Sequence, residues 1–361
     1  MEQMTSKKRI LSAVTGKQTD RVPWSPFLAY YWQYVPREEQ EKGEVAYMQK
    51  MGADPLLRGS CLLSVSEMKN VEHISKRDGN KMYDSYVTKV GTITEVRTYS
   101  AQADTWFLTG HPVSEEEDFK VLQYIYENMK ITEDTEPFAR EYEKLGENAV
   151  SCPNIGVNYK TSFQALVERW CGTEALSYAV YDFPETVEEC LAVMMEKDRE
   201  TVVNALNSPA EILNFFEDSS TTNISPAMFE KYTLPQINEW ADILHTKGKL
   251  LMHHACGHLK DIMPIIATSK IDIIESVTPP PTGNIEIAET FAILPERIAL
   301  IGGIDPTFFE SCTLDELEKY VKDLLSAARG RRFVLANSDS CPPGVTYDKF
   351  LLISDIVRNF R

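Results

Sequence analysis

Short apolar segments alternate with helical patterns through the second half of this 361-residue chain, and this alternation restricts the possible folds. The apolar segments predict five buried strands, at residues 212–216, 250–254, 271–275, 298–302 and 333–337. Residues between them have the apolar spacing of amphipathic helices. Strands that alternate with helices predict a parallel sheet joined by right-handed crossovers.

Three further apolar segments in the first half, at residues 21–27, 54–59 and 149–154, bring the number of predicted strands to eight. Eight strand–helix units predict a closed (β/α)8 TIM barrel that forms a single domain over residues 1–361. Residues 68–110 differ, because residues 88–96 alternate with period two around a glycine. This pattern predicts an insertion with a β-hairpin after the second strand.

An open, doubly wound parallel sheet is the alternative architecture. The nucleotide-binding forms of that fold carry a Gly-x-Gly-x-x-Gly or P-loop pattern where a strand passes into a helix, and this chain has neither. We therefore favour the barrel.

The charge and cysteine content exclude several classes of function. A formal net charge of −17 argues against nucleic acid or an anionic membrane as a partner. No apolar run approaches the length of a membrane span, and the first residues lack the apolar segment of a signal peptide. Seven cysteines without disulfide-like spacing indicate reduced thiols, so we expect a cytoplasmic protein.

A candidate metal site follows from the residues at the strand ends. His254 and Cys256 leave the predicted strand 250–254 on the same side, because side chains alternate along a strand. Cys341 follows the last predicted strand, and all strand ends of a barrel open into one mouth. We predict that these three side chains bind a zinc ion, with Glu275 as a fourth, exchangeable ligand and catalytic residue. The alternatives are that His254 and Cys256 are a packed pair in the core, and that Glu275 only pairs with a neighbouring cation.

Other polar and aromatic residues are expected at the same mouth. We assign substrate binding to five of them: Tyr30, Tyr31, Trp32, Arg58 and Asn154. Asp218 is the second candidate catalytic residue, with a role as a hydrogen-bond acceptor close to the metal ligands. The alternatives are that Asp218 only shapes a turn and that the tyrosines belong to the core.

Several motifs together resemble the uroporphyrinogen decarboxylase superfamily, and within it the zinc-dependent methyltransferases that work with corrinoid proteins. The resemblance covers nearly the whole chain. The similar segments are residues 11–16 with 20–23, 225–229 with 234–235, 254–257, 302–306 and 342–343. His-x-Cys followed by a late cysteine is similar to the zinc pattern of those methyltransferases.

This resemblance implies a (β/α)8 barrel that binds Zn²⁺ and moves a methyl group between a small molecule and the corrinoid (cobalamin) of a separate partner protein. The small molecule would be a methyl donor or a thiol acceptor, and the aromatic residues 30–34 favour an aromatic methyl ether. Two alternatives stay open. One is a uroporphyrinogen decarboxylase of porphyrin biosynthesis, although the loop 28–34 has no arginine where the decarboxylases carry arginines. The other is a non-catalytic barrel with a structural zinc.

Overall fold

A computed structural model describes residues 3–102 and 104–360. The predicted domain 1–361 also includes residues 1, 2, 103 and 361, which lie outside the described residues. The chain divides into two compact units. The first unit contains Met1–Leu62, Glu136–Asn154 and Ser208–Arg361. The second unit contains Leu63–Thr135 and Ile155–Asn207.

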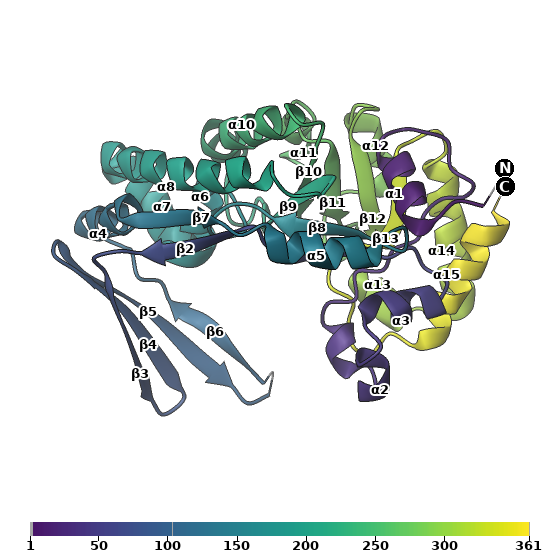
Figure 1. The fold of residues 1–361 in the computed structure, drawn as a ribbon, viewed down its shortest axis with the longest axis horizontal. Coiled ribbons are helices and arrows are strands. Elements are labelled where there is room, and N and C mark those ends of the chain that lie inside the picture. The colour runs from purple at the N-terminus through teal and green to yellow at the C-terminus, as the bar shows by residue number, and fades with distance from the viewer. Residues whose placement is uncertain (1–2, 103, 361) are drawn as a thin grey trace. The chain divides into compact units, whose positions relative to one another are not determined.

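A parallel sheet of seven strands forms the centre of the first unit (Figure 1). Its strands, in sheet order, are β1 (Leu56–Leu62), β8 (Val150–Asn154), β9 (Ile212–Glu217), β10 (Leu250–Ala255), β11 (Ile273–Val277), β12 (Ala299–Ile304) and β13 (Phe333–Asn337). All six neighbouring pairs are parallel. The strand predictions made from apolar runs are therefore confirmed for these seven segments, with shifts of up to a few residues at their ends.

The predicted strand at residues 21–27 is not a regular strand, and in this detail the prediction was wrong. Only Trp24 makes a β-bridge, to Leu335 of β13. Pro23 and Pro26 flank this short stretch, and proline cannot donate a ladder hydrogen bond. The Trp24 segment still bonds on both sides, because Ser25 N donates to Leu335 O at 2.9 Å and Asp54 N donates to Trp24 O at 2.6 Å.

The sheet is strongly curled. β1 and β11 are four strands apart in the sheet order, which in a flat sheet would separate them by about 19 Å. Nevertheless Arg58 Nε of β1 lies 2.8 Å from Glu275 Oε1 of β11, and both side chains are fully buried. The two strands therefore face each other across a closely curved sheet.

The inward positions of the strands change from apolar to polar along the strand direction. A buried apolar cluster joins alternate residues of the seven strands, such as Leu56, Ile212 and Ile273, to Ile10 and Val14 of the helix α1 (Ser6–Val14). The next inward positions are polar, and they are Arg58, Asn154, Asn214, His254 and Glu275. Polar side chains are thus collected at the carboxyl end of the sheet.

Helices of the first unit follow the strands in alternation, as the sequence pattern predicts. They are η1 (Tyr31–Tyr34), α2 (Arg37–Gln40), α3 (Glu44–Lys50), α5 (Glu136–Leu145), α9 (Pro226–Met228), η3 (Phe229–Thr233), α10 (Leu234–His245), α11 (Met263–Ile266), α12 (Ile287–Ile293), α13 (Pro306–Ser311), α14 (Leu314–Ala327) and α15 (Tyr347–Asn359). α10 buries Ile237, Trp240 and Leu244, which are three or four residues apart and so share one face.

The second unit combines an antiparallel sheet with helices. Its four-stranded sheet has the order β3 (Glu72–Asp78), β4 (Lys81–Thr88), β5 (Gly91–Ser100) and β6 (Thr105–Gly110). The turn between β4 and β5 lies within the period-two segment 88–96. The other elements are β2 (Ser64–Met68), β7 (Met129–Glu133), α4 (Glu116–Glu127), α6 (Ser162–Ala165), η2 (Leu166–Trp170), α7 (Gly172–Asp182) and α8 (Pro184–Ala205). Across residues 3–102 and 104–360, no helix has the length and apolar character needed to span a membrane.

Candidate metal centre

His254 lies on β10 at the carboxyl end of the sheet, and its orientation is fixed by a carboxylate. In the sheet register it is paired with Phe216 of β9 on one side and Glu275 of β11 on the other. Its Nδ1 is in hydrogen-bond contact with Glu275 Oε2. This contact leaves Nε2 as the ring nitrogen available to a metal, which is the arrangement typical of metal-binding histidines.

Cys256 immediately follows β10, and the backbone there is shaped by Gly257. Cys256 N donates to Glu217 O at 3.2 Å, which continues the pairing with β9 for one more residue. Gly257 has φ +87°, and a Cβ atom at this position would lie 2.5 Å from Ser220 Cβ. Only glycine allows this turn together with this close approach, so Gly257 fixes the direction in which the chain leaves the cysteine.

A third donor comes from the loop after β13. Ligand atoms of His254, Cys256 and Asp339 all lie within 4.8 Å of one another. A tetrahedral zinc ion with bonds of about 2.0–2.3 Å needs ligand atoms about 3.3–3.8 Å apart, so small side-chain rotations would close this group around an ion. Imidazole, thiolate and carboxylate are all zinc ligands. The residues therefore fit a zinc ion with three protein ligands and one open position.

Cys341, the predicted third ligand, is not a member of this group. Its backbone is held between two neighbouring segments, because Cys341 N donates to Phe27 O at 2.9 Å and Tyr31 N donates to Cys341 O at 3.0 Å. The side chain is completely buried, and its Sγ lies 3.7 Å from Pro342 O. Burial raises the pKa of the Cys341 thiol, with a smaller contribution from Glu310. Asp339, which precedes it by two residues, was missed because no motif distinguishes it.

Glu275 and Arg58 form a buried pair, which fits the alternative stated for Glu275, that it pairs with a neighbouring cation. Glu275 is completely buried between His254 and Arg58, so it supports the histidine and does not join the candidate ligands. Arg58, predicted to bind substrate, is buried as the partner of this carboxylate. Its contact has the distance of an ion pair but not the direction of a hydrogen bond.

The aromatic residues nearest to His254 are not those chosen from the sequence. The rings of Phe216 and Phe27 have their centroids 4.5 Å and 6.1 Å from the imidazole, and both side chains are partly exposed. Tyr31 instead packs against Phe350 of α15, with ring centroids 5.1 Å apart.

The flanking Tyr30 is 61% exposed, whereas the ring of Trp32 packs on Tyr47 with ring centroids 5.6 Å apart. For Tyr31, which is buried, the core alternative fits the packing better. The sequence did not identify Phe27 as a site residue, because it lies in a segment predicted as a strand. It did not identify Phe216 either, because the pattern does not distinguish it from the adjacent Phe215.

Asn154 and Asp218 lie at strand ends, as predicted. Asn154 accepts a hydrogen bond from Asn214 Nδ2 at 3.2 Å in the buried interior. Asp218 accepts from Asn223 Nδ2 at 2.7 Å and from Ser220 N at 3.3 Å, so these contacts shape the loop after β9. The turn alternative stated for Asp218 is consistent with these bonds.

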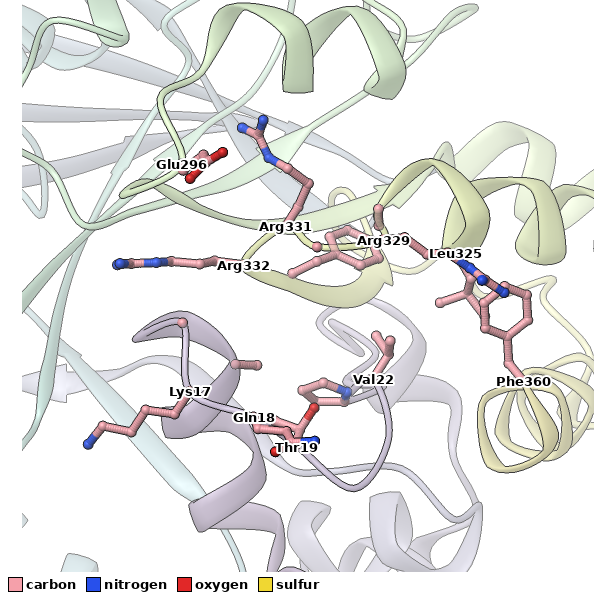
Figure 2. Close-up of a pocket in the computed structure, with 16 residues that line it drawn as sticks. Lys17, Gln18, Thr19, Val22, Glu296, Leu325, Arg329, Arg331, Arg332 and Phe360 are labelled. Atoms are coloured by element: carbon pink, nitrogen blue, oxygen red, sulfur yellow. The ribbon is translucent and has the colours of Figure 1, made fainter. Parts of the chain in front are cut away.

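A cavity of about 750 Å³ lies at the opposite end of the strands (Figure 2). It is lined by residues that precede β12 and β13 and by the loop after α1, and it contains the side chains of Lys17, Glu296, Arg331 and Arg332. Arg331 and Arg332 donate to the backbone oxygens of Leu294 and Arg297, respectively. None of the predicted site residues lines this cavity, so its size does not identify it as the reaction site.

A curled parallel sheet with helical crossovers, and polar residues gathered at the carboxyl ends of its strands, defines the class of α/β proteins whose sites lie at that end. The family model described as uroporphyrinogen decarboxylase (URO-D) matches residues 163–360, which is more than half of the chain. The chain belongs to the uroporphyrinogen decarboxylase family.

Curated relatives carry the same name at low identity. The chain is 24% identical over 243 residues to uroporphyrinogen decarboxylase of Parasynechococcus marenigrum (strain WH8102), and 25% identical over 245 residues to that of Synechococcus sp. (strain CC9902). Each match covers 65% of this chain and 65% of the relative, slightly less than two thirds of the relatives' length. Among solved structures, a methyltransferase from Methanosarcina mazei has the same fold, with a TM-score of 0.63 at 13% identity and 99% coverage of both chains.

Proposed function

We propose that this protein is a zinc-dependent methyltransferase that exchanges a methyl group with the corrinoid of a separate protein. The observation that carries the proposal is the convergence of His254, Cys256 and Asp339 at the carboxyl end of a curled parallel sheet. Three protein ligands with an open position are typical of a catalytic zinc. The solved structure of similar fold that bears the name methyltransferase is a second, weaker support.

The proposal includes the closure of the curled sheet into a barrel. We take the Trp24 segment as the eighth member of a closed (β/α)8 ring, because it bonds to β13 on one side and to Asp54, two residues before β1, on the other. A closed ring brings the ends of β10 and β13 to one mouth, which is what the shared metal site requires.

The ligands and the aromatic residues beside them have different roles in the proposed reaction. A bound zinc ion would either hold a thiol acceptor as thiolate or polarise the oxygen of a methyl donor. His254 presents Nε2 because Glu275 occupies its Nδ1, and Cys256 supplies a thiolate at the strand end. Phe27 and Phe216 stand beside the imidazole and limit the access of water from that side. An aromatic methyl ether suits such flat apolar surfaces.

The third ligand comes from the loop 339–341, and the two donors in that loop are distinguishable. The geometry favours Asp339, which lies with His254 and Cys256, whereas the family resemblance favours Cys341. Asp339→Asn is expected to lower zinc content strongly, and Cys341→Ser to leave most of the zinc in place. The reverse result would assign the ligand to Cys341 and require the loop to rearrange when zinc binds.

Elemental analysis followed by a methyl-transfer assay tests the function. The purified protein is expected to contain about one zinc ion per chain and to transfer methyl groups to cob(I)alamin from one member of a panel of aromatic methyl ethers, or from methylcobalamin to a thiol. His254→Ala is expected to lose both zinc and activity. His245→Ala is the matched control, because His245 is exposed and pairs with Asp272 away from the candidate ligands. A protein that contains zinc but transfers no methyl group would favour the structural-zinc alternative.

Decarboxylation of uroporphyrinogen is the second candidate, and the family name and the curated relatives favour it. Such a substrate carries many carboxylates and needs cationic partners at the site. Arg58 is the only arginine among the predicted site residues, and its charge is already compensated by Glu275. We therefore expect no coproporphyrinogen from the metal-free protein. Its formation at a steady rate would replace the methyltransferase proposal.

A further inference from the structure

A line of buried charged and polar groups crosses the interior of the curled sheet and ends at His254. Arg58 starts on β1, and Glu275 meets it from the facing strand β11, with Nε and Oε1 2.8 Å apart. The other oxygen of the same carboxylate contacts His254 Nδ1. Both charged side chains are completely shielded from water, and the histidine is nearly so.

Arg58 is itself held in place by several contacts. Its Nη2 donates to Ser25 O at 3.1 Å, and its Nη1 lies 3.4 Å from Leu56 O. The guanidinium carbon lies 5.2 Å from the centre of the Phe27 ring, within the range of a cation–π contact. The guanidinium is therefore anchored to the segment that closes the sheet and to the aromatic ring beside His254.

We propose that Arg58 is a positioning residue for the metal site, and that it acts through Glu275 on His254. Arg58 is fixed in place and holds one oxygen of the buried Glu275 carboxylate. The carboxylate cannot then rotate freely, so its second oxygen stays directed at the imidazole of His254. Such outer partners of metal-binding histidines fix the ring orientation and contribute about 10–100-fold to metal affinity. This inference rests on the proposed metal site and extends it to a residue on the opposite side of the sheet.

Metal affinity measured apart from catalysis tests the proposal. In Arg58→Met, zinc affinity determined against a chromophoric chelator is expected to fall by about 10–100-fold. In Arg58→Lys, which keeps the positive charge but not the forked donor, the loss is expected to be smaller. The absorption spectrum of the Co²⁺-substituted protein is expected to change in Arg58→Met, because the ring of His254 is no longer held at one angle.

Arg9→Met is the matched control. Arg9 is also a buried arginine of the first unit, with its Nε 2.6 Å from Asp20 Oδ1, but its partners are Asp20 and Asp54 rather than a residue at the metal site. Its replacement is expected to lower thermal stability and to leave zinc affinity unchanged. Equal loss of zinc affinity in both variants would mean that Arg58 has only a general structural role, and the proposal would fail.

A double variant tests the proposal even if Arg58→Met alone does not fold. Arg58→Met alone leaves the buried Glu275 without its cation, whereas Arg58→Met combined with Glu275→Gln removes both charges and keeps an acceptor for His254. This pair is still expected to bind zinc more weakly than the wild type, because the amide is no longer held from the other side. Wild-type affinity in the double variant would overturn the positioning role.

The same measurements separate this inference from the proposed function. If the wild-type protein binds neither Zn²⁺ nor Co²⁺, the metal site itself is wrong and Arg58 has no metal ligand to position. If the wild type binds zinc and Arg58→Met binds it equally well, only the role of Arg58 is refuted.

Discussion

Gly257 determines whether the residue before it can serve as a ligand. Its φ of +87° and its closeness to Ser220 leave no room for a side chain directly after Cys256. An added methyl group must push the loop after β9 away from the loop after β10. The geometry of the cysteine therefore depends on a residue that carries no ligand atom.

Gly257→Ala is expected to lower the free energy of unfolding by about 2 kcal/mol or more and to weaken zinc binding. Gly248→Ala is the control, because Gly248 also has a positive φ, +65°, but a Cβ there would meet no atom within 4 Å. In that control the free energy of unfolding is expected to fall by only about 1 kcal/mol, from backbone strain, and zinc affinity is expected to stay unchanged. Urea unfolding and chelator competition give the two readouts. Equal effects in both variants would show that the contact with Ser220 is unimportant.

At the scale of elements, apolar runs located the strands well because each buried strand needs a continuous apolar segment. Phe333–Asn337 matches its predicted range in full. The segment around Trp24 satisfies the same apolar pattern, but its two prolines leave a single bridge. The partners of Arg58 and Asp339 could not be predicted, because they depend on the curvature of the sheet and on loop geometry rather than on local pattern.

The start of α14 offers a test of local helix stability. Thr313 accepts from Glu316 N, and Glu316 accepts from Thr313 N at 2.8 Å, which together form a capping box. Thr313→Ala is expected to lower the free energy of unfolding by about 1 kcal/mol. Thr346→Ala at the start of α15 is a suitable comparison, because Thr346 makes no side-chain cap hydrogen bond there. A loss of the same size in both would mean that the cap of α14 contributes nothing specific.

For the whole molecule, one ionic cluster connects the N-terminal helix to the approach to β1. Burial tends to raise the pKa of Asp20, but the hydrogen bonds from Arg9 and from Met4 N, together with the charges of Arg9 and Arg21, outweigh it and lower the pKa to about 2. Arg9 also pairs with the fully buried Asp54, which in turn accepts from Trp24 N at 3.1 Å. The cluster therefore adds ion pairs to the packing of Ile10 and Val14, which already holds α1 against the strands.

The lowered pKa of Asp20 gives a pH prediction. A carboxyl group whose pKa is lower in the folded state stabilises that state above its ordinary pKa of about 4, and this contribution disappears as the pH falls towards 2. Because solvent screens part of this interaction at a partly buried carboxylate, the expected contribution is about 1–2 kcal/mol. Asp20→Asn is therefore expected to be less stable than the wild type at pH 6, with the difference shrinking below pH 4. Asp323→Asn, at an exposed ion pair, is expected to show almost no difference at either pH.

The order in which the residues of the site occur along the chain has a consequence for biosynthesis. Arg58 is made early, whereas Glu275 and the three candidate ligands all lie beyond residue 250. While the polypeptide is still growing on the ribosome, the arginine has no carboxylate to face and the proposed zinc site has no ligands. Under the proposed assignment, metal is therefore acquired by a nearly finished chain, after β13 has taken its place.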